Sequence, residues 1–438
     1  MYKFRKFKRL IWKKTENGQF YSIVNYLLKL FPKEITDEEK IEQKDFTRKK
    51  VLSFTIIIII IINLVKDRNT KGYDITMNLF WSQSKKNKIE LPTDFPPTSS
   101  AFSQARKKVK ADSIKKMFIS SKDRFEESYK DKYLWKGFRV FAVDGTKYTL
   151  PAEKELIEKF GCQNCGEKDA HYPQALVSVL FNVKSKIAYD VVIEDVKGNE
   201  REQLKTLCNS LSENDLIILD RGYPSYEIFK YLLKKKVDFL IRINCKNTYK
   251  FVEEFLKSNL NEQILEINVP NTNEYIKLRV LKSKNKNGEI RIFVTSLLAQ
   301  DKYSYQEIVD LYYERWEIEE HYKKNKELFK VENFHSKKEN GILQEIYAQL
   351  LLSNLTKIMM NEAEKDNKNK EGEPSFKNAV YVVENYINEM SLCENIEKIN
   401  LLIPNMLQEI SRVRYIKRKN RHFERKSYKL VSKWTRKK

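Results

Sequence analysis

The sequence contains little cysteine and little histidine, which narrows the metal chemistry that it can support. Its 438 residues include five cysteines, an odd number without regular spacing, which argues against a disulfide framework and fits a reducing compartment. Cys162 and Cys165 form a lone C-x-x-C with His171 nearby, but a structural zinc needs four ligands, so we expect a reduced pair in a loop. The four histidines form no H-E-x-x-H motif, which argues against histidine-based metal catalysis.

A segment that could enter or cross a membrane is also missing. The basic start of the chain runs into no signal-peptide core with a small-residue cleavage site. The most apolar run, VLSFTIIIIIIINLV at residues 51–65, is shorter than the roughly 20 residues of a membrane span and lies between lysines. We therefore predict a buried element of an N-terminal domain, no membrane partner and a cytoplasmic protein.

Acidic residues are outnumbered by basic ones. The chain has 83 Lys and Arg against 60 Asp and Glu, a formal charge of +23. Such an excess indicates a polyanionic partner, most simply DNA or RNA, although an A+T-rich genome that favours lysine is the alternative. The last segment, 411–438, sets many Lys and Arg against the single acid Glu424 and interleaves aromatic residues, as a nucleic-acid-binding tail does.

The chain is globular and long enough for two or three domains, since 41% of its residues are hydrophobic and 12% aromatic. Residues 1–90 read as helical and basic. The proline-rich segment LPTDFPPTSS at 91–100 predicts a linker that caps a helix at 101–118 through Thr98, Ser99 or Ser100. The basic side chains of that helix suit either phosphate contacts or a solvated face; they belong to Arg106, Lys107, Lys108 and Lys110.

From residue 138 the pattern predicts a mixed α/β sheet. A short apolar strand, FRVFAVD, ends at Asp144, and a second buried strand, LIILD, ends at Asp220. Between them we expect the hairpin ALVSVLF–IAYDVVI and the helix EREQLKTLCNSL, and after them the helix SYEIFKYLLKKK and the strand VDFLIRI. Three further strands, QILEINV, YIKLRVL and IRIFVTSL, form a β-rich insertion at 244–303, and mainly helices follow residue 326.

One stretch, YYERWEIEEHYKKNK at 312–326, predicts a helix with an unusual polar stripe. At about 100° per residue, Tyr312, Arg315, Glu319 and Lys326 fall within a sector roughly 60° wide. An apolar face made by Leu311, Ile318, Tyr322 and Phe329 lies beside this stripe. The alternative interpretation is a solvated charged face.

Three carboxylates are singled out by their positions. Asp144 and Asp220 end strands, where α/β sheets place functional groups, and Glu319 lies on the polar stripe. Three oxygen ligands suit Mg²⁺ or Mn²⁺, and two such ions can activate a water or a 3′-hydroxyl and stabilise the leaving oxygen of a phosphodiester. The alternatives are a common Asp-Gly turn at Asp144 and a helix cap at Asp220.

These motifs resemble the DDE transposases of bacterial insertion sequences, in the branch that carries the signature Y-x-x-R-x-x-x-E-x-x-x-x-x-x-K. Tyr312, Arg315, Glu319 and Lys326 match every spacing of that signature. Asp144 lies in the family's D-G-T context, and the second aspartate lies in D-R-G-Y at residues 220–223. The similarity covers roughly residues 92–370.

The resemblance implies a ribonuclease-H-like mixed sheet interrupted by the β-rich insertion, with helical N-terminal and C-terminal regions. It implies that Asp144, Asp220 and Glu319 ligate two divalent metals, Mg²⁺ or Mn²⁺, and that Tyr312, Arg315 and Lys326 bind DNA beside the cut. The division that follows is a DNA-binding region at 1–90, a linker and helix at 91–137, the first part of the catalytic core at 138–243, the insertion at 244–303, a catalytic helix at 304–335, a helical region suited to oligomerisation at 336–410, and a basic tail at 411–438.

The function that these implications describe is transposition in the bacterial cytoplasm, on the nucleoid. A homodimer in a synaptic complex would bind terminal inverted repeats, cleave the ends and join the 3′ ends to target DNA. The alternatives are an inactive DNA-binding relic, a metal-dependent nuclease without strand transfer, and a recombinase with Tyr312 as its nucleophile. The insertion lacks the tryptophan with which some relatives stack a flipped base, and Tyr249, Phe251, Tyr275 or Phe293 are the candidates to replace it.

Overall fold

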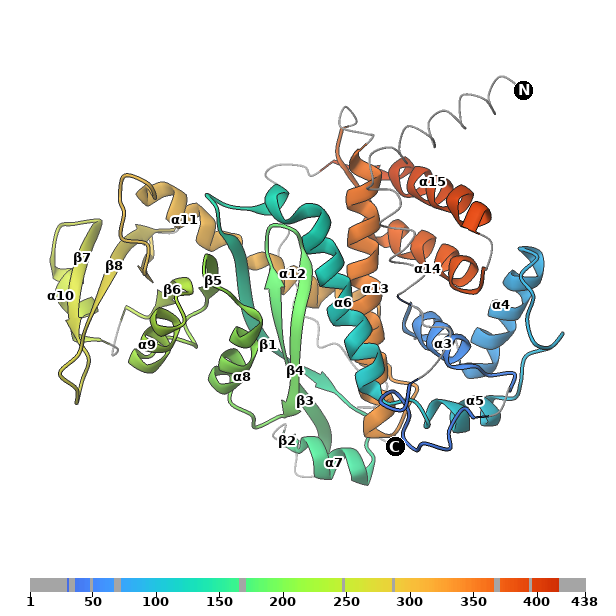
Figure 1. Cartoon of the computed structure of the whole chain (residues 1–438). Helices are drawn as coiled ribbons and strands as arrows, with labels where there is room; N and C mark the ends of the chain where they lie inside the picture. The colour runs from blue at the N-terminus through green and yellow to red at the C-terminus, as the bar shows by residue number, and fades with distance from the viewer. Residues whose placement is uncertain are drawn as a thin grey trace, which may run out of the picture.

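The computed structural model describes most of the chain between residues 30 and 416 (Figure 1). The described ranges are residue 30 and residues 36–47, 50–66, 72–164, 171–245, 249–285, 288–365, 371–393 and 396–416. The predicted basic tail beyond residue 416 and the basic start of the chain lie outside these ranges, as does Cys165.

A mixed sheet forms the centre of the β-containing half. Its first five long strands are arranged in the order β4-β3-β1-β5-β6. The strand β3 is antiparallel to both of its neighbours β1 and β4, whereas β1, β5 and β6 run parallel to one another. This order and these directions are those of a ribonuclease-H-like sheet, so the predicted fold class is confirmed. The strands are β1 (Arg139–Thr149), β3 (His171–Asn182), β4 (Ile187–Asp195), β5 (Asp215–Leu219) and β6 (Asp238–Ile243).

The insertion extends this sheet instead of forming a separate one. Beyond β6 the order continues with β9, β8 and β7, each antiparallel to the strand before it. The short strand β2 (Cys162–Asn164) pairs with one end of β3. The predicted insertion strands are therefore present, and a short helix accompanies them. These elements are α10 (Lys250–Lys257), β7 (Glu262–Asn268), β8 (Tyr275–Lys284) and β9 (Ile290–Thr295).

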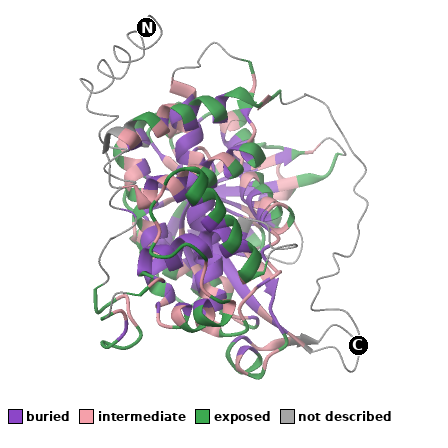
Figure 2. Cartoon of the chain, turned by 90° about the vertical axis from the view of Figure 1, so that its right-hand side faces the viewer, coloured by how far each residue is buried: buried purple, intermediate pink, exposed green. Residues whose placement is uncertain are grey.

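A long central helix, α13 (Glu339–Lys365), joins the sheet to a layer of helices (Figure 1). On one side it packs along α6 (Ala111–Tyr129), and on the other against helices from both ends of the chain. Most of the side chains of α13 are buried, and Figure 2 shows buried residues gathered in the middle of the molecule. The helices that pack against this other side are α3 (Phe54–Lys66), α14 (Phe376–Leu392) and α15 (Ile396–Arg412).

The isoleucine run is buried within this helical layer. Ile56 through Ile62 lie in α3 and are at most 3% exposed, which confirms the predicted buried element. In the part of the chain that the structure describes, no helix combines the length and the apolar character that a membrane span needs. The neighbouring helices are α4 (Tyr73–Lys86) and α5 (Ser99–Arg106), and the side chain of Thr98 caps α5 by accepting a hydrogen bond from the Ala101 amide.

Three local predictions were wrong in their boundaries. The strand β1 does not end at Asp144 but continues to Thr149, because its second half pairs with β3. The helix expected at 101–118 is interrupted after Arg106, where the backbone of Lys110 and that of Lys108 bond to the 39–41 segment.

The helix expected at 312–326 is interrupted as well. It consists of α11 (Tyr305–Tyr313) and α12 (Trp316–Glu327), joined by a turn at Glu314 and Arg315. In this turn the amides of Glu314, Arg315, Glu317 and Ile318 bond to the carbonyl three residues earlier, which tightens the backbone relative to an α-helix. The apolar face is nevertheless buried as expected, at Leu311, Ile318, Tyr322 and Phe329.

Candidate active site

Asp144 lies in β1, just past the point where that strand stops pairing with β5 and continues to pair with β3. The parallel pairing of β1 with β5 ends at Ala142 opposite Ile218, and from there β1 pairs only with β3, where Asp144 is opposite Val179. The Asp144 carboxylate accepts a hydrogen bond from the Gly145 amide at 3.0 Å. Asp144 therefore lies beside the carboxyl end of β5, and the charge of Asp220 acts on its carboxyl.

Asp220 follows directly after β5, on the same edge of the sheet. Its carboxylate accepts a hydrogen bond from the Gly222 amide at 2.7 Å, which closes a tight turn through the D-R-G-Y sequence. The Arg201 guanidinium holds this turn in place by donating to the carbonyls of Gly222 and Pro224, both at 3.1 Å. Asp220 thus follows the end of β5, as the sequence predicts, whereas Asp144 lies within the parallel neighbour β1, just past the point where its pairing with β5 ends.

Helix α12 brings Glu319 to this edge, with Arg315 one turn before it. The Arg315 guanidinium donates to the Glu319 carboxylate at 2.6 Å, and its positive charge also acts on Asp144. Arg315 is only 8% exposed, and its Nε group has no hydrogen-bond acceptor among the described residues. One buried cation is therefore shared between Glu319 and the aspartate edge.

Two contacts fix α12 on β1. The Tyr322 hydroxyl donates to the Asp144 carbonyl at 2.7 Å and accepts from the Val179 amide at 3.1 Å. Further along the helix, the Lys326 ammonium donates to the Lys147 carbonyl at 3.0 Å and lies 5.6 Å from the centre of the Tyr148 ring. Both contacts hold the helix to the stretch of β1 that contains Asp144.

Tyr312 is buried at the end of α11, where its ring packs against Phe293 with centroids 4.6 Å apart. Burial raises the pKa of its phenol, although Arg315 and Arg242 offset this effect. A raised pKa disfavours the phenolate that a nucleophilic tyrosine needs, which argues against the recombinase alternative. Of the four aromatic residues considered as partners for a flipped base, Tyr275 is the most exposed, at 63%, and Phe293 is fully buried.

Burial is the largest influence on the electrostatics of this edge, followed by the charge of Arg315 and then by the neighbouring acids. Burial raises the pKa of Asp144 to about 7, and the negative charges of Asp220 and Glu200 add to this effect. Arg315 and the Gly145 amide act in the opposite direction. A raised pKa means that the charged form of the carboxyl is destabilised, and a nearby cation would relieve this cost.

The sequence pointed to the six predicted residues but missed three others. Glu200 begins helix α8 (Glu200–Leu207), and burial and Asp220 raise the pKa of its carboxyl. Tyr223 is 1% exposed and is influenced by the charges of Glu200, Asp144 and Asp220. Arg201 donates hydrogen bonds to backbone carbonyls of the turn that follows Asp220. The only signal for Glu200 and Arg201 was an Asn followed by charged residues, which marks any ordinary helix start.

The donor set fits a hard divalent cation better than any other ligand. Carboxylate oxygens are the ligands that Mg²⁺ and Mn²⁺ prefer. Among the described residues, however, no three Asp, Glu, His or Cys side chains converge closely enough to form a ready metal site. One of the three predicted ligands, Glu319, is paired with Arg315 instead of lying free beside the two aspartates.

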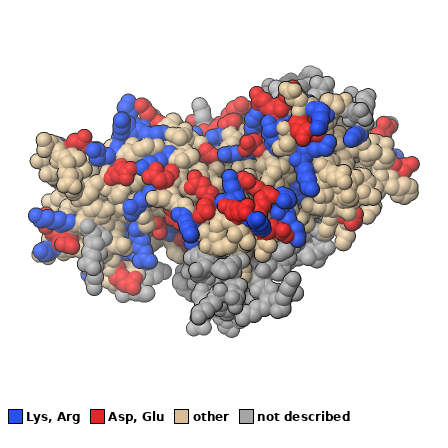
Figure 3. Space-filling view, turned by 90° about the horizontal axis from the view of Figure 1, so that it is seen from below, with Lys and Arg blue, Asp and Glu red and all other residues tan. Residues whose placement is uncertain are grey.

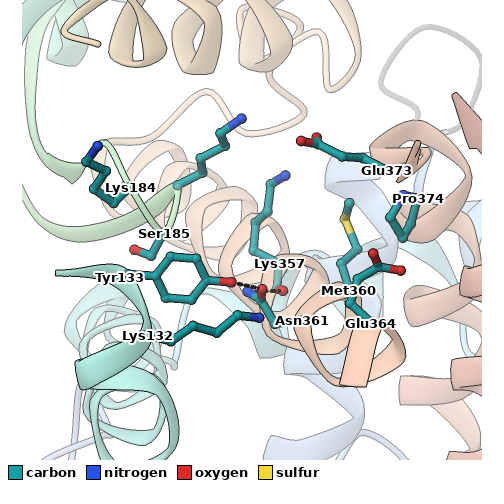
Figure 4. A pocket seen from close by; sticks show the side chains of 11 residues that line it. Lys132, Tyr133, Lys184, Ser185, Lys357, Met360, Asn361, Glu364, Glu373 and Pro374 are labelled. Carbon is teal, nitrogen blue, oxygen red and sulfur yellow. Dashed lines mark hydrogen bonds between the residues drawn. The ribbon is translucent and has the colours of Figure 1, made fainter. Parts of the chain in front are cut away.

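A separate hollow lies between η1 (Lys130–Tyr133), the β3–β4 turn, α13 and β10 (Glu373–Pro374) (Figure 4). Its volume is about 250 Å³, and its lining includes four lysines, namely Lys132, Lys184, Lys186 and Lys357. Lys184 and Lys186 form ion pairs with Glu314 and Glu317, whereas the Lys357 ammonium lies over the Phe376 ring at 4.9 Å from its centre. This hollow is not part of the acidic edge.

Charge on the described surface is mixed. On the face seen in Figure 3, basic and acidic side chains are interspersed and form no continuous positive field. Much of the basic excess belongs to segments outside the described ranges, since residues 417–438 contain eleven Lys or Arg and one acid. The part of the chain that the structure describes therefore has no strong excess of positive charge on this face.

A ribonuclease-H-like sheet with one aspartate in its first strand, another directly after the parallel neighbour and a glutamate on a helix beside them is an arrangement typical of enzymes that act on phosphodiesters. Residues 135–355, half of the chain, match the family described as the transposase DDE domain, and the chain belongs to this family. It is thus a DNA transposase by family.

Two bacterial relatives of this chain are themselves named as transposases. The chain is 23% identical over 326 residues to the transposase InsG of insertion sequence element IS4 from Escherichia coli, covering 72% of this chain and 71% of that protein. It is 24% identical over 266 residues to a putative transposase of insertion sequence element IS4SA from Synechocystis, covering 60% and 71%. A cryo-EM structure of a piggyBac transposase synaptic complex with hairpin DNA is similar to this structure at a TM-score of 0.48 and 10% identity, over 90% of this chain and 83% of that one.

Proposed function

We propose that the protein binds the terminal inverted repeats of its own insertion sequence, cleaves the ends by two-metal phosphodiester hydrolysis and joins the 3′ ends to target DNA. One arrangement supports this proposal: Asp144 lies in β1 and Asp220 directly follows the parallel neighbour β5, and α12 holds Glu319 and Arg315 against the same edge. The family assignment supports the choice of reaction class, and the arrangement supports the choice of residues.

In this proposal the three carboxylates hold two Mg²⁺ or Mn²⁺ ions. When bound, such ions supply activation of the attacking oxygen and stabilisation of the leaving oxygen. For Glu319 to join Asp144 and Asp220, its ion pair with Arg315 has to open, and a DNA phosphate is the natural new partner for the guanidinium. Tyr322 keeps the Asp144 backbone in register with α12 while this exchange takes place.

The remaining signature residues have positioning roles in the proposal. Arg315 has an unused buried donor at Nε, which suits a second hydrogen bond to a phosphate oxygen. Lys326 supplies a point charge beside β1, and Tyr312 at the end of α11 lies close enough to Arg315 to act on its guanidinium. The basic tail at 411–438 adds non-specific attraction to the DNA backbone.

The experiment that tests this function is a cleavage assay with purified protein, Mg²⁺ and DNA that ends in the element's inverted repeats. The DNA that flanks the gene identifies those repeats. We expect Asp144→Ala and Glu319→Ala each to abolish cleavage and to leave repeat binding largely intact. Full cleavage by either variant would overturn the proposal.

The products of the same assay separate the remaining alternatives. Cleaved ends without joined products would indicate a nuclease without strand transfer, and binding without cleavage would indicate an inactive relic. We further propose a homodimer on paired ends, in the bacterial cytoplasm. Sedimentation of the protein with repeat-ended DNA should give the mass of two chains bound to two ends.

A further inference from the structure

The hollow of Figure 4 contains a largely buried lysine that no carboxylate neutralises. The Lys357 side chain extends from α13 between the β3–β4 turn and Glu373 (Figure 4). Its ammonium lies 4.9 Å from the centre of the Phe376 ring, and it forms no ion pair with any described residue. Burial, followed by the charges of Lys324 and Lys186, lowers the pKa of Lys357 to about 7. A positive charge in this place is therefore costly unless an anion lies beside it.

A second polar group in the lining of the hollow also lacks a partner. Ser185, in the β3–β4 turn, is 4% exposed, and its hydroxyl forms no hydrogen bond with any described residue. The turn does not depend on this hydroxyl, because the Ser185 amide donates to the Asn182 side chain at 3.0 Å. Buried hydroxyl groups are ordinarily hydrogen-bonded. An unused donor and an unneutralised ammonium in one hollow together call for an acceptor that carries negative charge.

The two carboxylates of the lining do not supply this negative charge. Glu364 is engaged by the Arg414 guanidinium through two hydrogen bonds, at 2.6 and 3.0 Å. Glu373 is exposed and accepts a hydrogen bond from the Tyr415 hydroxyl at 3.4 Å. Its charge acts on Lys357 and opposes the lowering of the pKa, but it forms no ion pair with the ammonium. The hollow therefore keeps an unmatched positive charge.

The size and the surroundings of the hollow fit a phosphate group of DNA. Its volume of about 250 Å³ is the space of roughly eight water molecules, and ammonium groups bind phosphates as point charges. Two of its lysines, Lys184 and Lys186, pair with Glu314 and Glu317, which flank Arg315 in the turn between α11 and α12. Ion pairs thus join the hollow to the turn that positions Arg315, which favours a DNA phosphate over an unrelated anion.

We propose that this hollow binds a phosphate of the DNA backbone outside the catalytic edge, with the Lys357 ammonium supplying the charge and the Ser185 hydroxyl donating a hydrogen bond. The inference takes from the proposed function only that DNA is the substrate, and it uses none of the three predicted catalytic carboxylates. A phosphate in the hollow neutralises the buried ammonium and gives the Ser185 hydroxyl its missing acceptor.

The test is the affinity of the full-length protein for a duplex DNA without inverted repeats, measured by fluorescence anisotropy in EDTA at several salt concentrations. We expect Lys357→Met to weaken binding roughly fivefold or more and to lower the salt dependence by about one phosphate contact. Ser185→Ala should weaken binding by a smaller factor, because it removes a neutral donor and leaves the charge. The matched control is Lys377→Met, which removes the same charge from an exposed position on α14 and should leave the affinity nearly unchanged.

Inorganic phosphate, titrated by calorimetry, separates the two sources of the ligand. The wild type should bind phosphate, DNA should compete with it, and Lys357→Met should lose this binding. Loss of phosphate binding in Lys357→Met together with wild-type affinity for DNA would overturn DNA as the ligand. Wild-type affinity of Lys357→Met for both probes, or equal losses in Lys357→Met and Lys377→Met, would overturn the site itself.

Folding is monitored separately, by thermal unfolding of each variant. Ser185→Ala removes a single buried oxygen, so it tests the site even where Lys357→Met does not fold. Failure of the proposed function is read independently, from full Mg²⁺-dependent cleavage by Asp144→Ala or Glu319→Ala, since the binding assays contain no divalent metal.

Discussion

The Arg315 guanidinium donates a hydrogen bond to the Glu319 carboxylate at 2.6 Å, one helical turn along the same chain. In the absence of DNA this pair neutralises one of the three predicted catalytic carboxylates. Because the guanidinium also acts on Asp144, its departure changes the charge of the whole edge. The two residues therefore have opposite expected effects on DNA binding, although they touch each other.

Arg315→Ala should weaken the binding of repeat-ended DNA by roughly tenfold or more, the loss expected for a hydrogen bond between charged groups. Glu319→Gln should bind as tightly as the wild type or more tightly, because it frees the guanidinium for a phosphate. Fluorescence anisotropy without divalent metal measures both. Lys116→Ala removes a cation that pairs with Glu38 on the surface and serves as the control. Wild-type affinity of the Arg315 variant would contradict the assignment of this residue to DNA.

Asp144→Asn should stabilise the metal-free protein at pH 8 more than at pH 5. Burial raises the pKa of Asp144 to about 7, whereas an unfolded aspartate titrates near 4. Between these values the folded state binds more protons, so its stability falls as the pH rises, and above pH 7 the full cost of the buried charge is present. At about 1.4 kcal/mol per pKa unit, the gain from the variant is at most roughly 4 kcal/mol.

Urea unfolding in EDTA at the two pH values measures this gain. Asp310→Asn, at an exposed position on α11, is the control and should change little at either pH. A gain at pH 5 equal to that at pH 8 would show that the variant acts through packing and not through the charge of Asp144.

The sequence predicted the elements and the order of the catalytic motifs because their signals are local. Strand and helix periodicity placed β1, β5 and the run 312–326, and the motif spacing named Asp144, Asp220 and Glu319. The continuation of β1 past Asp144 depends on pairing with β3, and the break at Arg315 depends on how two helices meet the sheet. Neither effect has a local sequence signal.

The same reason explains why Glu200 and Tyr223 were missed as site residues. Glu200 is 55 residues after Gly145, and only the folded sheet brings the two together. Tyr223 belongs to the D-R-G-Y motif, but nothing in the sequence shows that its hydroxyl is buried. Arg106, read from the sequence as a phosphate contact or a solvated cation, is neither, since it is 3% exposed and pairs with Glu345.

Arg106→Met should therefore destabilise the protein by about 3–5 kcal/mol, the usual cost of leaving one partner of a buried ion pair without the other. The Arg106 guanidinium donates to Gln344, to the Gly341 carbonyl and to Glu345, which tie α5 to α13. Adding Glu345→Gln should recover part of the loss, because it removes the stranded charge. Urea unfolding measures both. Lys107→Met, at the exposed neighbouring position, should have no comparable effect, and equal stability of the Arg106 variant and the wild type would contradict this role.

Lys357→Met should stabilise the protein, and the gain should be largest at or below neutral pH. Burial is the first cause that lowers the pKa of Lys357, to about 7, and Lys324 and Lys186 lower it further. An unfolded lysine titrates near 10.4, so between about pH 7 and pH 10 the unfolded state binds more protons and stability rises with pH. The cost of the buried ammonium is fully present below pH 7 and disappears above pH 10. Methionine has a similar length, and it retains the packing against Phe376.

Urea unfolding at pH 6.5 and pH 9.5 compares Lys357→Met with Lys377→Met, an exposed position on α14. A gain at pH 9.5 as large as that at pH 6.5 would show that the Lys357 ammonium is not desolvated in the hollow of Figure 4.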